Sequence, residues 1–249
     1  MARKLLNVGI LVAFTAALSA VYAQPGGVRL LGTQAGRPGK VVKGAPYSAD
    51  VTNETTRTLA DGNTIRQVSS GRVYRDSEGR TRQEPALQAL GSGALGAKVP
   101  QLAFIYDPVA SVSYALNLRN RTATRTVWPA PAARSANLPN ALPRREQANA
   151  RRESLGTQVL AGLVAEVTRN TLTIPAGQIG NAQPLSVVTE RWYSPDLQVV
   201  LYSKRTDPRE GETVFQLTNI NRSEPPAGLF TVPADFPMSD VAAGPRRRP

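Results

Sequence analysis

The chain has 249 residues, a formal net charge of +12, no histidine and no cysteine. The absence of these two residue types excludes disulfides, the usual zinc and haem ligands, and the Ser-His-Asp and Cys-His nucleophile systems. Stability must therefore come from strand pairing and apolar burial.

Residues 1–23 have the features of a secretory signal peptide. Two basic residues precede an apolar run from Val8 to Leu18, and a cleavage site of the small-residue type follows at Val21-Tyr22-Ala23. This run is shorter than the roughly 20 apolar residues that a membrane-spanning helix needs. We therefore expect cleavage before Gln24 and export to the periplasm or the extracellular space.

Residues 24–45 are rich in glycine and are expected to form a flexible N-terminal segment. Residues 46–128 then have the pattern of β-strands and are predicted to be the first half of a β domain. The predicted strands here run from Tyr47 to Leu59, Asn63 to Arg75, Arg80 to Glu84 and Ser111 to Leu118.

Two local features of this half are predicted from turn chemistry and side-chain alternation. Ala60-Asp61-Gly62 is a strong hairpin turn, because Asp-Gly suits the positive φ angles that tight hairpin loops require. The apolar positions change parity between Val68 and Val73, which predicts a β-bulge at Ser69-Ser70-Gly71. The stretch from Leu87 to Val99 fits either a short helix or a loop.

Residues 129–153 are rich in proline, alanine and arginine, and they are predicted to form a flexible linker or long loop. Residues 154–238 resume the strand pattern and are predicted to be the second half of the same β domain. Its expected strands run from Leu155 to Leu160, Leu163 to Ile174, Leu185 to Tyr193, Leu197 to Lys204 and Glu212 to Ile220. Residues 239–249 are expected to be a basic, disordered tail.

Most of the excess positive charge lies in the tails and the linker, while the two strand-rich halves are close to neutral. A nucleic-acid-binding protein would concentrate lysine and arginine on a folded face. We therefore predict no nucleic-acid partner. Attraction of the basic tails to acidic envelope surfaces, or simple solubility, explains the charge.

The fold class predicted from about ten short strands without a long amphipathic helix is mainly β. We expect a strongly curved antiparallel sheet or a barrel, with a β-sandwich as the alternative. The tails and the linker are expected to be disordered.

Two stretches resemble known exported proteins. The block from Glu190-Arg191-Trp192-Tyr193-Ser194-Pro195-Asp196-Leu197 to Leu229-Phe230-Thr231-Val232-Pro233-Ala234-Asp235-Phe236 is similar to the C-terminal half of exported lipoprotein-carrier-like proteins. The stretch from Val73 to Arg82 resembles a segment of uncharacterised bacterial exported proteins. The first resemblance implies an unclosed β half-barrel with a concave apolar surface.

The sequence does not favour an enzyme. Five carboxylates that could serve a glycoside hydrolase lie close together in the sequence, but four of them are at or beside turns, where Asp and Glu are ordinary. They are Glu190, Asp196, Asp207, Glu210 and Glu212. We therefore predict no catalytic residues, no metal site and no cofactor.

The predicted function is that of an exported binding protein that holds an apolar ligand or lipid on a concave sheet face. The alternative is an envelope module of the same fold that senses stress or docks a partner protein.

The tentative ligand-binding residues come from the hairpin between Leu185 and Leu201. A two-residue loop at Pro195-Asp196 would place Trp192 opposite Val199 and Glu190 opposite Leu201. A five-residue turn ending at Gly211 would add two residues of the next strand to the same face. The predicted set is Val188, Glu190, Trp192, Val199, Leu201, Phe215 and Leu217. Whether this face is open to a ligand or is the filled core of a barrel is left open by the sequence.

Overall fold

The computed structural model describes residues 41–86, 101–127 and 149–242. The predicted signal peptide, residues 24–40, the stretch from Leu87 to Val99, residues 128–148 and residues 243–249 lie outside the described part of the chain. No helix within the described ranges is long and apolar enough to cross a membrane.

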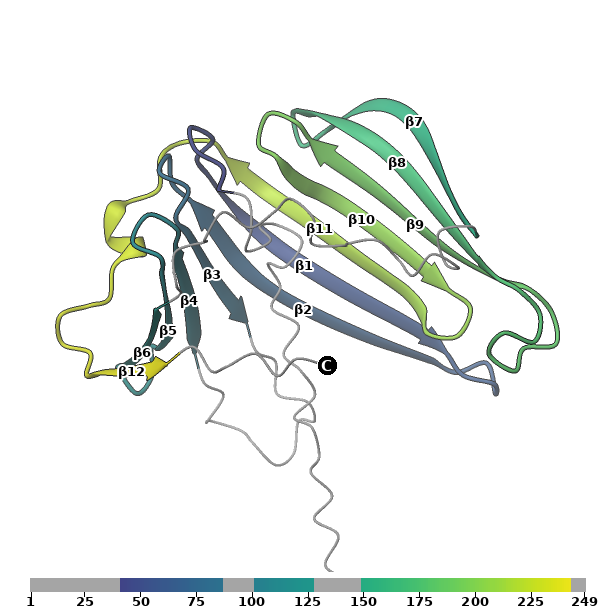
Figure 1. Cartoon of the computed structure of the whole chain (residues 1–249), viewed down its shortest axis with the longest axis horizontal. Coiled ribbons are helices and arrows are strands. Elements are labelled where there is room, and N and C mark those ends of the chain that lie inside the picture. Colours follow the sequence, from purple (N-terminus) through teal and green to yellow (C-terminus); the bar gives the residue numbers. More distant parts are fainter. Residues whose placement is uncertain (1–40, 87–100, 128–148, 243–249) are drawn as a thin grey trace, which may run out of the picture.

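The described chain forms twelve β-strands and one short 3-10 helix (Figure 1). The strands are β1 (Tyr47–Thr58), β2 (Thr64–Arg75), β3 (Thr81–Ala86), β4 (Leu102–Asp107), β5 (Val112–Asn117), β6 (Thr122–Val127), β7 (Ala150–Leu160), β8 (Leu163–Ile174), β9 (Leu185–Ser194), β10 (Val199–Asp207), β11 (Gly211–Asn221) and β12 (Met238–Ala242). The helix is η1 (Ala227–Phe230).

All twelve strands belong to one open sheet with the order β12-β6-β5-β4-β3-β2-β1-β11-β10-β9-β8-β7. Neighbouring strands are antiparallel, except that β12 runs parallel to β6. The sheet curls at its β12 end and does not close, as Figure 1 shows. The predicted mainly β fold of half-barrel type is therefore confirmed. The number of strands is higher than expected, because β4, β6 and β12 were not predicted individually.

The two strand-rich halves of the chain meet in the middle of this sheet. β1, from the first half, pairs with β11, from the second half, over the length from Ser48 to Thr56. The last residues of the predicted linker, residues 129–153, belong to β7, which begins at Ala150. The first residues of the predicted basic tail, residues 239–249, belong to β12, which extends to Ala242.

The first hairpin turn is as predicted. β1 and β2 pair up to Thr58 and Thr64, and the amide of Gly62 donates to the carbonyl oxygen of Leu59 at 3.0 Å. Gly62 has a φ of +83°, a left-handed conformation that glycine adopts without steric cost.

The bulge predicted in β2 is wrong. The pairing of β1 with β2 runs from Tyr47 to Thr58 without a shift in register. Val68 and Val73 differ in parity because they project to opposite sides of a regular strand, where Val73 is buried and Val68 is half-buried. Register shifts occur elsewhere, between β1 and β11, in β7 and in β10.

The two faces of the sheet can be followed through the strand pairs, because directly paired residues project to the same side. Val51 and Leu217 are paired, and they define the side that we call the Val51 face. Gln216, the neighbour of Leu217, pairs with Tyr202, and Tyr202 pairs with Trp192. These three residues project to the opposite side, which we call the Trp192 face.

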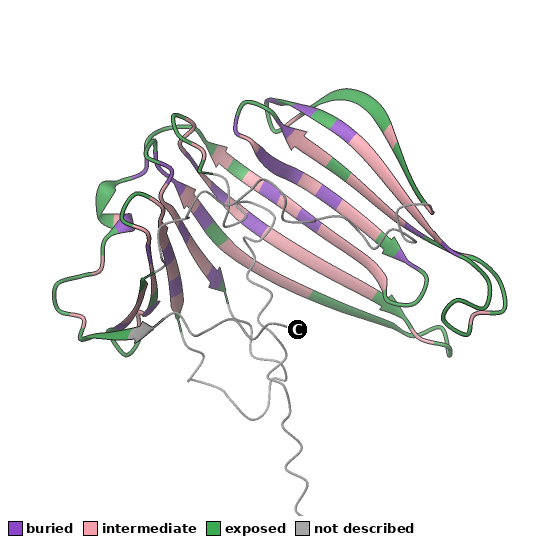
Figure 2. Ribbon diagram, in the orientation of Figure 1, coloured by how far each residue is buried: buried purple, intermediate pink, exposed green. Residues whose placement is uncertain are grey.

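The main apolar core lies over the central strands, where Figure 2 shows the buried positions. In β1, β2 and β11 its members are on the Val51 face. The buried members are Tyr47, Ala49, Val51, Val73, Leu163, Ala165, Leu197, Val199, Val200, Leu201, Phe215 and Leu217. Each buried valine, leucine or phenylalanine among them contributes about 1.5–3 kcal/mol by removal of apolar surface from water.

A second, smaller core lies on the Trp192 face of β4, β5 and β6. Ile105 and Leu116 are buried there, and Val232 and Phe236 pack against them. Val232 and Phe236 belong to residues 222–237, which connect β11 to β12 across the sheet and which we call the strap. Glu224 anchors the start of the strap by accepting hydrogen bonds from the amide and hydroxyl of Ser77 at 3.1 Å.

Candidate ligand-binding site

The predicted register of the β9–β10 hairpin is wrong. The loop has four residues, Pro195 to Gln198, and Trp192 pairs with Tyr202 and not with Val199. Ser194 causes part of this difference, because its hydroxyl accepts a hydrogen bond from the amide of Leu197 at 3.3 Å. The loop therefore folds inward, and Leu197 is 1% exposed.

A second change follows within β10. The register shifts between Val200 and Tyr202, so Leu201 is an extra residue opposite β9. Glu190 then pairs with Lys204 and not with Leu201. A β-bulge of this kind increases local twist and lets successive side chains be buried. Val199, Val200 and Leu201 are all buried in the main core.

The register of the next hairpin is as predicted. The loop between β10 and β11 ends at Gly211, and Phe215 pairs with Ser203. Phe215 and Leu217 are therefore on the same side as Leu201. That side is the Val51 face and not the face of Trp192, because the first hairpin is out of the predicted register.

The tentative binding residues are thus divided between the two sides of the sheet. Val188, Glu190 and Trp192 are half-buried on the Trp192 face. Leu201, Phe215 and Leu217 are at most 2% exposed on the Val51 face. Val199 pairs with Ser194 beside the loop and is also buried. The structure does not bring these seven residues together in one site.

Trp192 forms a small aromatic cluster on its own face. Its ring meets Tyr202 edge-on, with 4.8 Å between centroids and an interplanar angle of 86°. The indole nitrogen donates a hydrogen bond to the side-chain oxygen of Gln158 on β7 at 2.9 Å. An aromatic side chain with a satisfied N–H and a half-exposed ring is suited to contact a ligand as well as the core.

The Trp192 face is otherwise rich in ion pairs between neighbouring strands. In each pair, both partners come from positions whose strand pairing places them on this face. The pairs are Arg66–Glu54, Arg72–Asp50, Arg82–Glu84, Arg125–Asp240, Arg169–Glu190 and Lys204–Glu212. Exposed pairs of this kind contribute little to stability, but they make the face polar.

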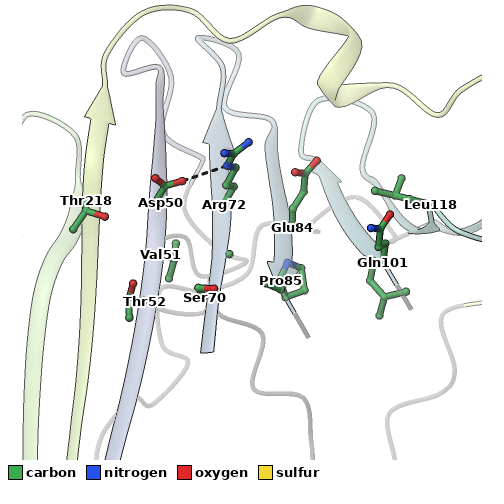
Figure 3. Close-up of a pocket in the computed structure, with 13 residues that line it drawn as sticks. Asp50, Val51, Thr52, Ser70, Arg72, Glu84, Pro85, Gln101, Leu118 and Thr218 are labelled. Atoms are coloured by element: carbon green, nitrogen blue, oxygen red, sulfur yellow. Dashed lines mark hydrogen bonds and ion pairs between the residues drawn. The ribbon is translucent and has the colours of Figure 1, made fainter. Parts of the chain in front are cut away.

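A hollow of about 830 Å³ lies on this face, over β1, β2 and β3 (Figure 3). Its volume is within the range of small-molecule sites. The residues that line it are Asp50, Val51, Thr52, Ser70, Gly71, Arg72, Glu84, Pro85, Ala86, Gln101, Leu102, Leu118 and Thr218.

One row of directly paired residues supplies the charges of the hollow. Asp50 of β1 is paired with Arg72 of β2, and Arg72 is paired with Glu84 of β3. The Arg72 and Asp50 side chains are 3.3 Å apart, and Asn219 donates a further hydrogen bond to Asp50 at 2.8 Å. Hydrogen bonding to Tyr74 and the charge of Asp50 raise the pKa of Arg72, which stays cationic. The row therefore alternates in charge: negative, positive, negative.

The strap holds one end of this row in place. Arg82, which is 7% exposed, donates to Glu84 at 2.6 Å and to the main-chain oxygen of Leu229 at 2.9 Å. Its guanidinium therefore orients Glu84 while tying η1 to β3. On this face the apolar part of the lining comes from Leu118, which follows β5, and from Ala86, the partner of Ser70. Leu102 pairs with Asn117 and projects to the Val51 face.

Sequence reasoning did not single out the residues of the hollow. Asp50 and Thr52 alternate with apolar residues in β1, which indicates a polar face, but Arg72 and Glu84 join them only through the pairing of three strands. Among the described residues, no group of three or more carboxylates lies close enough together to hold a metal ion.

No protein-family model matches the chain, and no curated protein matches it. Solved structures with a similar fold exist. An uncharacterised conserved protein from Thermus thermophilus is 12% identical, with a TM-score of 0.42 over 79% of this chain and 91% of that chain. MucB, in its complex with MucA from Pseudomonas aeruginosa, is 14% identical, with a TM-score of 0.41 over 78% of this chain and 57% of that chain. This chain thus spans less than two thirds of that MucB chain.

A LolA superfamily protein from Nitrosomonas europaea is also similar. It is 9% identical, with a TM-score of 0.31 over 75% of this chain and 90% of that chain. The sequence resembles lipoprotein-carrier-like proteins, and a LolA superfamily protein is among the solved structures with a similar fold. At these identities it is a likeness of fold.

Proposed function

We propose that the protein is an exported, non-enzymatic binding protein and that the hollow on its Trp192 face holds an amphiphilic ligand. The observation that carries this proposal is the mixed lining of the hollow. The charged row of Asp50, Arg72 and Glu84 lies on one side of it, and Leu118, which packs against the second core, supplies an apolar side chain on the same face. A ligand with a polar head and an apolar body matches both parts.

The charge pattern of the row restricts the chemical class of the ligand's head group. A group with both charges, such as a phosphate linked to an amine, would set its anion against Arg72 and its amine against Asp50 or Glu84. A purely anionic head would meet repulsion from the two carboxylates. Zwitterionic amphiphiles are therefore expected to bind more tightly than anionic ones of equal chain length.

The predicted site residues take different parts in this proposal. Three strand spacings of about 4.8 Å separate Trp192 on β9 from β1, so an acyl chain of ordinary length reaches from the hollow to the ring. Trp192, with Val188 and Glu190 beside it, forms the outer margin of the proposed site. The buried residues Val199, Leu201, Phe215 and Leu217 stabilise the sheet from within the core.

The test compares two variants that add the same side chain to the same face. Ser70→Phe fills the hollow, whereas Thr171→Phe places the ring on β8, outside it. Full-length protein from the envelope of the producing cells is analysed by native mass spectrometry and then titrated with lysophosphatidylethanolamine. We expect binding by the wild type and by Thr171→Phe, and at least tenfold weaker binding by Ser70→Phe. Equal binding by all three proteins, or no binding by any, would overturn the proposal.

A further inference from the structure

β7 lies at an edge of the sheet, and no other strand within residues 41–86, 101–127 and 149–242 pairs with its outer side. β7 pairs with β8 and is the last strand in the sheet order. It is eleven residues long, and nine of these residues are exposed. The free backbone N–H and C=O groups of such a strand are a template for the addition of another strand.

β7 carries only part of the features by which proteins protect an exposed edge, and these lie in its first half and its middle. Short length, charged side chains, proline and β-bulges are the usual means. β7 is long and contains no lysine and no proline, and its charged residues, Arg151, Arg152 and Glu153, are confined to its first half. A register shift between Ser154 and Thr157, where Gly156 has a φ of +82°, interrupts the strand in its middle. The opposite edge, β12, is only five residues long.

The side chains of β7 divide it into two halves of different chemistry. Arg151 and Arg152 are exposed in the first half, with Glu153 beside Arg151 at 2.7 Å. In the second half Val159 is 75% exposed, and its partner on β8, Val164, is 50% exposed. Val159 and Val164 thus form an exposed apolar pair at the sheet edge, which an added strand with aliphatic side chains would cover.

We propose that β7 is a docking site for a partner protein, which adds an extended segment to this edge. The segment carries acidic side chains opposite Arg151 and Arg152 and aliphatic side chains opposite Val159. The backbone hydrogen bonds supply affinity, and the two halves of β7 set the direction and register of the added strand.

A second copy of this chain fits the edge less well. Two β7 strands paired antiparallel about their midpoint, Leu155, would place Arg151 of each copy opposite Val159 of the other. The charged half of each strand would then meet the apolar half of its partner. A partner segment with separate acidic and aliphatic parts avoids this mismatch.

This docking site is separate from the hollow of the proposed amphiphile site and meets only its outer margin, where Trp192 donates a hydrogen bond to Gln158 of β7. β8, β9 and β10 separate β7 from the strands that line the hollow. Ser70→Phe changes the hollow without altering β7, and Val159→Lys changes β7 without altering the hollow, so the two proposals fail separately.

The test is hydrogen exchange of the full-length protein with synthetic peptides. The first peptide has two aspartates followed by alternating valine and threonine, and the second has lysines in place of the aspartates. We expect the first peptide at millimolar concentration to slow exchange of residues 150–160 about tenfold, and the second to leave it unchanged. Replacing both arginines, Arg151→Glu with Arg152→Glu, should reverse this preference.

Two further variants test whether protection depends on β7 itself or on any exposed valine of the protein. Val159→Lys should abolish protection by the first peptide, whereas Val109→Lys, at a site 61% exposed in the β4–β5 turn, should leave that protection unchanged. Absence of protection with both peptides overturns the proposal. Protection of β7 without peptide, increasing with protein concentration together with a dimer mass, overturns it in favour of a second copy.

Discussion

Arg75 of β2 donates a hydrogen bond to the main-chain oxygen of Leu197, 122 residues away in the sequence, at 2.5 Å. The same guanidinium donates to the oxygen of Ala45 at 2.7 Å and lies over the ring of Tyr47, 4.8 Å from its centroid. It thereby joins the start of β1 to the β9–β10 loop, two parts of the chain that share no strand pairing. Arg75 is 4% exposed, so these contacts are made away from water.

Removal of this guanidinium should destabilise the fold strongly. Arg75→Met keeps most of the apolar stem but leaves two carbonyl oxygens without their donor, at a cost of about 2–4 kcal/mol. Urea unfolding measures the change. The matched substitution Arg66→Met removes an exposed ion pair with Glu54 and should change the midpoint little. Equal effects of the two substitutions would contradict the role of Arg75.

Tyr47 should remain protonated well beyond the ordinary range of tyrosine. Burial raises the pKa of Tyr47 from 10.0 to about 12, partly offset by the charge of Arg75. Because the unfolded chain releases this proton first, the contribution to stability is complete below pH 10 and is lost as the pH rises toward 12. Unfolding midpoints between pH 9 and 11.5 should fall more steeply for the wild type than for Tyr47→Phe.

Asp207 should stabilise the β10–β11 hairpin at neutral pH and lose this effect in acid. Hydrogen bonding from Arg209, chiefly, lowers the pKa of Asp207 from 3.8 to about 2. Its contribution is therefore complete above pH 3.8 and is lost as the pH falls through 2. Asp207→Asn should cost about 1 kcal/mol at pH 7, because solvent screens the half-exposed arginines.

The pH dependence distinguishes this charge effect from a loss of packing. The difference between wild type and Asp207→Asn should shrink as the pH is lowered from 5 to 2, measured by chemical unfolding. Glu210→Gln, in the exposed turn beside it, serves as the control and should be neutral. A difference that stays constant over this pH range would argue against the ion pairs.

Gly211 should be the least replaceable glycine of the described turns. Its φ is +93°, and a Cβ atom there would lie 2.2 Å from the main-chain oxygen of Thr56. Gly211→Ala therefore adds a backbone clash to an unfavourable conformation and should cost more than about 3 kcal/mol. Gly62→Ala, with φ +83° and no atom within 4 Å, should cost only about 1 kcal/mol. Thermal unfolding of both variants measures the difference.

Replacement of two members of the predicted binding set by smaller residues should change the free energy of unfolding by different amounts. Leu217 is 1% exposed in the main core, so Leu217→Ala should cost about 3 kcal/mol through the cavity that it leaves. Trp192→Phe keeps the edge-on contact with Tyr202 and should change stability by less than about 1.5 kcal/mol. If Trp192 borders the ligand, the same substitution should weaken lysophosphatidylethanolamine binding severalfold. Intact binding by Trp192→Phe would remove this residue from the proposed site.

The sequence by itself determined the features that depend on neighbouring residues. Alternation of apolar and polar side chains identified most of the strands, and turn chemistry identified the hairpins at Asp61-Gly62 and before Gly211. The register of the second of these hairpins was correct because an odd loop that ends in a left-handed glycine leaves few alternatives.

The register of the β9–β10 hairpin and the position of the hollow depend on contacts between distant segments, and only the tertiary structure decided them. The β9–β10 register differs from the predicted one because Leu197 folds into the core and Leu201 forms a bulge, which burial favours over the shortest loop. A shift of one residue moves a side chain to the other face of the sheet, so the predicted binding set was divided. The hollow was not predictable either, because Asp50, Arg72 and Glu84 come together only when three strands pair in register.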